Sequence, residues 1–308
     1  MVAIPWPAIW MAQVGRPLED RRVYESQIIY GHLGFDVRTF DDVFSYVSGE
    51  YLWGWILNLL VRTNGLSIDL AFGLISAFVT FTACLVITRH APPMYTLLLF
   101  NPSFIDLAFS QLRIATALSM LCTAYLIRGP RTLVLPVRIA LLAAACFVHT
   151  SMGIFITLFL IAIFVVRRPR IRQSRGRYTL LVGGGFAAAL LLGPLRDGIL
   201  AGLGDRRLGI DYHSYGLRFY FFWICMAIVM TVLWKRINLS VASAYALAAL
   251  STILFGLALG VYVNRVIAIS LPFLVAAVHA VPKPSRNLLV VAYVGYVGLY
   301  WLFWLNMW

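Results

Sequence analysis

The chain has 308 residues, of which 61% are hydrophobic and only 12% are charged. A typical soluble domain is about 45–50% apolar and about 25% charged, so this composition excludes a disordered chain, a secreted disulfide scaffold and most soluble enzymes. The mean hydropathy of +0.85 indicates a multi-pass membrane protein. The net charge of +13 is also found in nucleic-acid-binding proteins, but the placement of the basic residues, described below, argues against that partner.

Apolar runs follow one another along almost the whole chain. At about 20 residues per bilayer crossing, a chain of this length has room for about ten spans joined by short loops. We therefore expect an all-α polytopic membrane protein with about 10–11 transmembrane helices, forming a single transmembrane domain over residues 1–308. The apolar runs are 2–14, 66–88, 93–109, 112–127, 132–148, 150–166, 178–195, 216–234, 240–258, 265–281 and 287–307.

Two of these runs depart from an ordinary spanning helix. Residues 2–14 are short for a span and lack the basic region and cleavage site of a signal peptide, so whether they cross the membrane stays open. The Asn101-Pro102 pair predicts a kink or break within 93–109, because proline removes an amide donor and disfavours helix at the residue before it. The four cysteines are far apart in apolar runs, which predicts buried thiols without a disulfide or a metal site.

The basic residues predict the orientation in the membrane. Residues 167–177 contain six arginines and no acid, which indicates a cytoplasmic segment that also contacts anionic lipid. Alternation outward from it places fourteen of the 25 Lys and Arg residues on the cytoplasmic side and all twelve acidic residues outside. The net charge is therefore mostly a topological bias, and we expect no nucleic-acid partner. The outer-face loops are expected at about 15–65 and 196–215.

Three basic side chains stand at the outer ends of predicted helices, namely Arg113, His149 and Arg265. Arginine at the centre of a span costs about 2.5–3.5 kcal/mol on insertion scales, so such residues are usually paired or functional. For the two arginines the alternative to a functional role is snorkelling, or a structural ion pair with Asp69 or Asp106. For His149 the alternative is a hydrogen bond to a backbone carbonyl.

An outer-face group of arginines suits a ligand that carries phosphate, because a guanidinium binds phosphate in a bidentate manner and stays charged. Nearby carboxylates or a histidine can act as a general base. The chain contains no D-x-D, P-loop, H-E-x-x-H or G-x-S-x-G motif. These residues favour a transfer from a lipid-linked phosphate donor that uses neither a metal nor a cofactor.

Several short motifs follow one another in a particular order. They are R-x-x-x-D-x-x-x-Y (Arg16, Asp20, Tyr24), the start of a span at Glu50 and Tyr51, L-R-x-A-x-A-L (Arg113, Ala115, Ala117, Leu118), H-T-S (His149, Thr150, Ser151) and a late intramembrane Arg265. In this order the chain resembles the EpsG family, which is grouped with Wzy-type O-antigen and exopolysaccharide polymerases. Two features differ from the family pattern: only about 14 residues precede the first motif, and the stretch between Tyr24 and Glu50 is compact.

The resemblance implies a membrane glycosyltransferase of the GT-C type, located in the bacterial inner membrane. Such an enzyme joins oligosaccharide repeat units carried on undecaprenyl diphosphate at the outer, periplasmic face, with the diphosphate lipid as the leaving group. The expected partners are the lipid-linked donor and acceptor and membrane lipid, with a chain-length regulator and a flippase as further candidates. No cofactor is expected.

The same hypothesis assigns candidate residues to three roles. Binding of the diphosphate is expected from Arg113 and Arg265, with Arg16 and Arg206 as additional candidates. The candidates for the general base are His149, Glu50 and Asp20. Substrate binding is expected from Tyr24, Tyr51 and Asp205. The sequence does not fix the order among the bases, although histidine titrates near the working pH.

Two other classes of protein would also use arginines near a membrane surface. A transporter or flippase of lipid-linked oligosaccharide usually shows inverted repeats and polar sites near the midplane. A membrane O-acyltransferase of surface polysaccharide takes an acyl donor from the cytoplasm, and would place polar residues deeper or at the inner face. Clustering of the polar residues at one outer face favours the polymerase.

The charge distribution predicts opposite sides for two serines. Ser174 lies in the arginine-rich cytoplasmic segment, whereas Ser214 lies in the second outer loop. In intact cells, an impermeant maleimide should therefore label Ser214→Cys and leave Ser174→Cys unlabelled until the cells are lysed. Labelling of both cysteines from the same side would contradict the topology.

Overall fold

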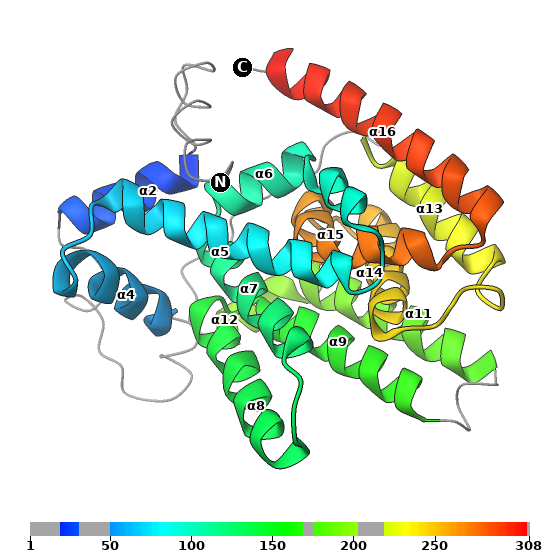
Figure 1. Cartoon of the computed structure of the whole chain (residues 1–308), viewed down its shortest axis with the longest axis horizontal. Helices are drawn as coiled ribbons and strands as arrows, with labels where there is room; N and C mark the ends of the chain where they lie inside the picture. Colours follow the sequence, from blue (N-terminus) through cyan, green and yellow to red (C-terminus); the bar gives the residue numbers. More distant parts are fainter. Residues whose placement is uncertain (1–18, 31–49, 169–174, 203–218, 307–308) are drawn as a thin grey trace.

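The computed structural model describes residues 19–30, 50–168, 175–202 and 219–306, and within these ranges it contains helices and their connections but no strand. Figure 1 shows how the helices are arranged. In chain order they are α2 (Glu19–Ile29), α4 (Tyr51–Leu57), the π-helix η1 (Asn58–Thr63), α5 (Ile68–Thr88), the 3-10 helix η2 (Pro93–Leu99), α6 (Pro102–Phe109), α7 (Leu112–Leu126), α8 (Arg131–Val148), α9 (Met152–Arg167), α11 (Arg175–Leu192), α12 (Arg196–Gly202), α13 (Phe221–Val232), α14 (Val241–Ala258), α15 (Val263–Ala280) and α16 (Lys283–Asn306). The apolar run 2–14 lies outside the described residues.

Several of these helices have the length and composition of membrane spans. Within the described ranges, α5, α14, α15 and most of α16 qualify individually. The number rises to six if two bent pairs count as one span each: α6 with α7, bent by 100°, and α11 with α12, bent by 62°. Helices α8, α9 and α13 are apolar but shorter than the other candidates. The chain is thus an all-α protein of the multi-pass membrane type, while the total of about 10–11 spans stays a prediction.

The interruption predicted at Asn101-Pro102 is confirmed. Helix η2 ends just before it, and α6 begins at Pro102, where a missing amide donor costs nothing because first-turn amides have no helical partner. The side chain of Asn101 caps α6 by accepting a hydrogen bond from the backbone N–H of Ser103 at 2.9 Å. After the sharp bend that follows α6, the side chain of Gln111 donates to Asp106 at 2.7 Å. This second bend, which the sequence did not predict, turns α7 away from the axis of α6 by 100°.

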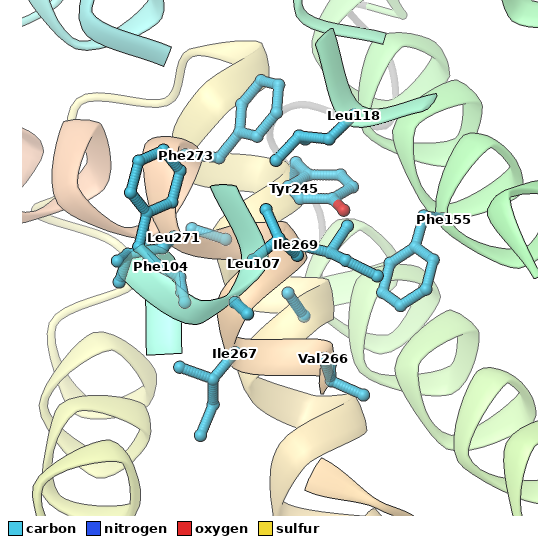
Figure 2. Close-up of a cluster of buried hydrophobic side chains, with 14 of the residues drawn as sticks. Phe104, Leu107, Leu118, Phe155, Tyr245, Val266, Ile267, Ile269, Leu271 and Phe273 are labelled. Atoms are coloured by element: carbon cyan, nitrogen blue, oxygen red, sulfur yellow. The ribbon is translucent and has the colours of Figure 1, made fainter. Parts of the chain in front are cut away.

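The core of the protein is formed around α14 and α15, which lie at the centre of Figure 1 and are 72% and 78% buried. Figure 2 shows hydrophobic side chains of α6, α7, α9, α14 and α15 packed together there, among them the ring of Tyr245. The rings of Tyr245 and Phe273 lie 4.7 Å apart, and Phe159 of α9 lies 6.2–6.3 Å from both. By contrast, α16 is only 22% buried and runs along the edge of the molecule.

Helices α11 and α14 approach each other closely because one of them carries glycine at the contact. A Cβ atom added to Gly185 would lie 2.5 Å from the carbonyl oxygen of Ala248 and 2.6 Å from Cβ of Ser251. Small residues at such contacts let two helix backbones pack against each other in a membrane. The neighbouring Gly183 has open space around its Cα, so only one of the two glycines is required for packing.

We therefore expect Gly185→Ala to destabilise the protein, since the new methyl group meets backbone atoms that cannot move aside. Overpacking of this kind costs about 1–3 kcal/mol. The thermal unfolding midpoint of the detergent-purified protein should fall for Gly185→Ala. It should stay the same or rise for the matched control Gly183→Ala, because alanine favours helix over glycine. Equal midpoints for the two variants would contradict the close approach.

The connections between helices gather at two ends that differ in their charged residues. At one end, called the basic end here, Arg89 and Arg138 donate to the carbonyls of Tyr125 and Ile127 at 2.8 and 2.6 Å. The opposite end, called the acidic end, contains six acidic side chains of the described residues, which form ion pairs or other electrostatic contacts there or line the cavity described below. They are Asp20, Glu25, Glu50, Asp69, Asp106 and Asp197.

Candidate active site

Three connections between helices meet at the acidic end and line a cavity of about 540 Å³. They join α8 to α9, α11 to α12, and α14 to α15. This volume lies within the usual range of about 300–1,000 Å³ for small-molecule sites. Its polar and charged lining residues are His149, Thr150, Ser151, Arg196, Asp197, Tyr262 and Arg265.

His149 occupies the first of these connections and is held there by the backbone. Its N–H donates to the carbonyl of Ala145 at 2.9 Å and so closes the last turn of α8. Its own carbonyl accepts from the N–H of Met152 at 3.0 Å, where α9 begins. The extended backbone at His149 (φ −152°, ψ 114°) separates the two helices. The imidazole is therefore placed by the ends of two helices, and it is almost fully buried.

The carboxylate of Glu50 connects His149 to Arg113. One oxygen, Oε1, lies 2.6 Å from His149 Nδ1, and the other, Oε2, pairs with Nη1 of Arg113. The Glu50 side chain is only 5% exposed, so both interactions lie in a medium of low dielectric constant. Its backbone is left-handed (φ 55°, ψ 43°), a conformation that costs a non-glycine residue about 1–3 kcal/mol and that is often found at functional sites.

This arrangement fixes the tautomer of the histidine. A carboxylate that is paired with a guanidinium is ionised and only accepts hydrogen bonds, so Nδ1 of His149 carries the proton and donates it to Glu50. The other ring nitrogen, Nε2, then has a lone pair. Nε2 is buried and has no hydrogen-bond partner among the described residues, and His149 is one of the residues that line the cavity. The imidazole can therefore accept a proton at Nε2 once a local movement of the neighbouring groups exposes this atom to a ligand.

Arg265 supplies positive charge to the same cavity. It lies in the first turn of α15, with its guanidinium 5.6 Å from the centre of the Tyr262 ring. Arg196, at the start of α12, also lines the cavity and forms an ion pair of 3.7 Å with Asp197. Two guanidinium groups and one imidazole thus border a single cavity, which is a suitable environment for a ligand with an anionic group.

Helix α2 closes the site on the side of Arg113. The guanidinium of Arg113 lies 5.9 Å from the centre of the Tyr24 ring, and this ring packs edge-on against Trp53 at 5.2 Å. Burial raises the pKa of Tyr24 to about 12, so this phenol stays protonated. Asp20, one turn earlier, is close enough to Tyr24 to interact with it electrostatically. The aromatic rings therefore shield the pair of Arg113 and Glu50 from water.

The structure brings most of the predicted residues together but gives Arg113 a different neighbour. Arg113 and Arg265 both lie within electrostatic reach of His149, yet Arg113 contacts Glu50 and is not among the residues that line the cavity. Tyr51 follows Glu50 at the start of α4 and is half-buried. The remaining candidates, Arg16, Asp205 and Arg206, lie outside the described residues.

Sequence reasoning missed Arg21, the most buried charged residue of α2. It pairs with Asp69 at the start of α5 and with Glu25 one turn along α2, the latter at 2.9 Å. Asp69 therefore has a partner other than the two arginines considered for it. Asp106 accepts from Gln111, so neither acid forms the structural pair with Arg113 that was the alternative to function. Arg196 and Tyr262 were also missed, since neither belongs to a motif.

Comparison with models of known protein families, with curated proteins and with solved structures finds no match. In the part of the chain that the structure describes, no three His, Cys, Asp or Glu side chains are arranged to hold a metal ion. The four cysteines are present as free thiols.

Neutralising Glu50 should destabilise the protein. In Glu50→Gln the guanidinium of Arg113 loses its buried counterion, and breaking a buried ion pair from one side costs about 3–5 kcal/mol. We expect a clear fall in the midpoint of thermal unfolding in detergent, and partial recovery in the double variant Glu50→Gln/Arg113→Met, which leaves no unpaired charge. The matched control is Glu25→Gln, which removes a carboxylate that is 29% exposed and should cost under about 1 kcal/mol. A control as unstable as Glu50→Gln would refute the central role of Glu50.

Proposed function

We propose that this protein is a membrane glycosyltransferase that polymerises undecaprenyl-diphosphate-linked oligosaccharide repeat units at the outer face of a bacterial inner membrane. The proposal includes a GT-C type architecture with about 10–11 spans, membership of the EpsG and Wzy-type group of polymerases, and a mechanism without a metal. The lipid-linked donor and acceptor are its substrates, and a chain-length regulator and a flippase are candidate partners.

One observation carries this proposal: a histidine held by a buried carboxylate lies at the same cavity as two arginines. A transfer from a diphosphate donor requires a base for the attacking hydroxyl and positive charge for the departing group. His149 provides the first, and Arg265 with Arg196 provides the second. The order of motifs in the sequence adds the substrate class, since composition and geometry alone indicate only an anionic, lipid-accessible ligand.

In the proposed reaction, a sugar hydroxyl of the acceptor donates its proton to Nε2 of His149. The hydroxyl oxygen attacks the anomeric carbon of the donor sugar, and the bond from this carbon to the diphosphate oxygen breaks. Glu50 keeps the imidazole in the correct tautomer and stabilises the imidazolium that forms. The role of Glu50 is thus to orient and stabilise the base, while the proton moves to histidine.

The negative charge that grows on the diphosphate is stabilised by Arg265 and Arg196. Such preorganised electrostatic stabilisation is usually the largest contribution to catalysis. Arg113, which was expected to share this role, is engaged by Glu50 at the edge of the site. We therefore assign it to neutralising Glu50, and assign the diphosphate contact to the two arginines that line the cavity.

The position of these groups also favours an enzyme over a flippase. His149 lies between α8 and α9, Arg265 lies in the first turn of α15, and Arg196 begins α12. All three are therefore at helix ends, whereas substrate sites of transporters usually lie near the midplane of the membrane.

Replacement of the base and of one cavity arginine tests the proposal. His149→Gln removes the proton acceptor and should lower polymer formation by about 10²–10⁴-fold. Arg265→Lys keeps the charge but loses the bidentate fork, and should lower it by about tenfold or more. The measurement is the ladder of lipid-linked repeats made by a strain that lacks the native gene and expresses each variant.

The matched control is Arg62→Lys, an exposed arginine in η1. Its ladder should equal that of the wild type, and all variants should be present in the membrane at equal amounts. A normal ladder from both His149→Gln and Arg265→Lys would refute the proposed active site. Loss of transport across the membrane, with the repeat units trapped inside, would instead indicate a flippase.

A further inference from the structure

A second polar groove lies at the basic end, far from the candidate active site in the fold. It has a volume of about 630 Å³ and is formed where the turn between α7 and α8 meets the end of α9. Its lining combines three arginines with small or apolar residues. The lining residues are Arg128, Gly129, Val134, Leu135, Arg138 and Arg167.

The charge in this groove is uncompensated within the described residues. Arg138 donates one N–H to the carbonyl of Ile127 at 2.6 Å, which fixes its side chain, while its buried Nε has no partner there. Arg167 and Arg89 are close enough to act on Arg138 electrostatically. No ion pair joins a described carboxylate to Arg128, Arg138 or Arg167. Three guanidinium groups at one groove therefore offer a binding site for an anion.

An apolar face begins directly beside these arginines. Leu135 is one helical turn from both Arg138 and Ile139, so it lies between the arginine and the rest of the apolar face of α8. Leu135 is 46% and Ile139 is 59% exposed, and α8 lies at the lower edge of the molecule in Figure 1. A ligand that occupied the groove would therefore have a cationic site for its head and an exposed aliphatic surface for its tail.

We propose that this groove binds the head group of an anionic phospholipid, with an acyl chain lying against Leu135 and Ile139. The phosphate contacts Arg128 and Arg167, and the fixed guanidinium of Arg138 lies at the base of the site. A free phosphate ion would match the arginines but would leave the apolar face uncovered. The proposal does not depend on the proposed function, because none of these residues belongs to the candidate active site.

The test measures binding of phosphatidylglycerol to the full-length protein in detergent by native mass spectrometry. We expect phosphatidylglycerol to bind about tenfold more tightly than phosphatidylcholine. The head group of phosphatidylglycerol has a net negative charge, whereas the choline of phosphatidylcholine cancels the charge of its phosphate. The double variant Arg128→Gln/Arg167→Gln should lose this preference. Arg138 is left unchanged in the variant, since it also caps the end of α7.

The matched control is Arg175→Gln/Arg236→Gln, which removes two exposed arginines from the basic end but outside the groove. This control should keep the preference for phosphatidylglycerol over phosphatidylcholine within about twofold of the wild type. A change of that size is expected from the general attraction between a basic surface and an anionic lipid. An equal loss in the control would show diffuse attraction and overturn the site. Equal binding of the two lipids to the wild type would also overturn it.

Inorganic phosphate and a second variant complete the test. Phosphate in large excess should not displace phosphatidylglycerol, and full displacement would identify a free-anion site instead of a lipid site. Leu135→Asp places a carboxylate in the groove and leaves every arginine in place, so it should weaken phosphatidylglycerol binding by charge repulsion and by loss of the apolar contact. Unchanged binding in this variant would refute the proposed position of the lipid.

Discussion

The candidate site depends on one buried carboxylate. Glu50 interacts with Arg113 through one oxygen and with His149 through the other, and the Glu50 side chain is almost fully buried. Each interaction alone would be costly: an unpaired guanidinium or carboxylate there would lose its hydration without compensation. Together they make a neutral ion pair that also orients an imidazole. Elements that are far apart in sequence are thereby tied together, namely the start of α4, the first turn of α7 and the end of α8.

The sequence predicted the class of fold and much of the site because both follow from strong local signals. Apolar runs and the Asn101-Pro102 pair indicate where helices extend and where one is broken. Charged residues at helix ends are so costly in a membrane that Arg113, His149 and Arg265 stood out without any structure. Their closeness in space follows from the alternating direction of successive helices, because the outer ends of helices lie on one side of the membrane when the chain crosses it repeatedly.

The partner of each charged side chain could not be predicted in the same way. Asp69 and Asp106 were reasonable partners for Arg113 and Arg265, because all four were predicted on the same side of the membrane. In the structure Asp69 pairs with Arg21, and Asp106 accepts a hydrogen bond from Gln111. The choice of Glu50 for Arg113 depends on how α4 docks against α7, which no periodicity encodes. Arg196 and Tyr262 have ordinary sequence surroundings, and they line the cavity only because three connections between helices meet there.

Helix α7 shows how the two charged ends of the protein are related. A helix carries partial positive charge at its N-terminus and partial negative charge at its C-terminus. The N-terminal turn of α7 is next to the Glu50 carboxylate, and its last carbonyls accept hydrogen bonds from Arg89 and Arg138. Both ends of its dipole are therefore compensated by residues from other helices. The charges around α7 thus favour the direction in which it runs, because a reversed α7 would place its amide end beside two arginines.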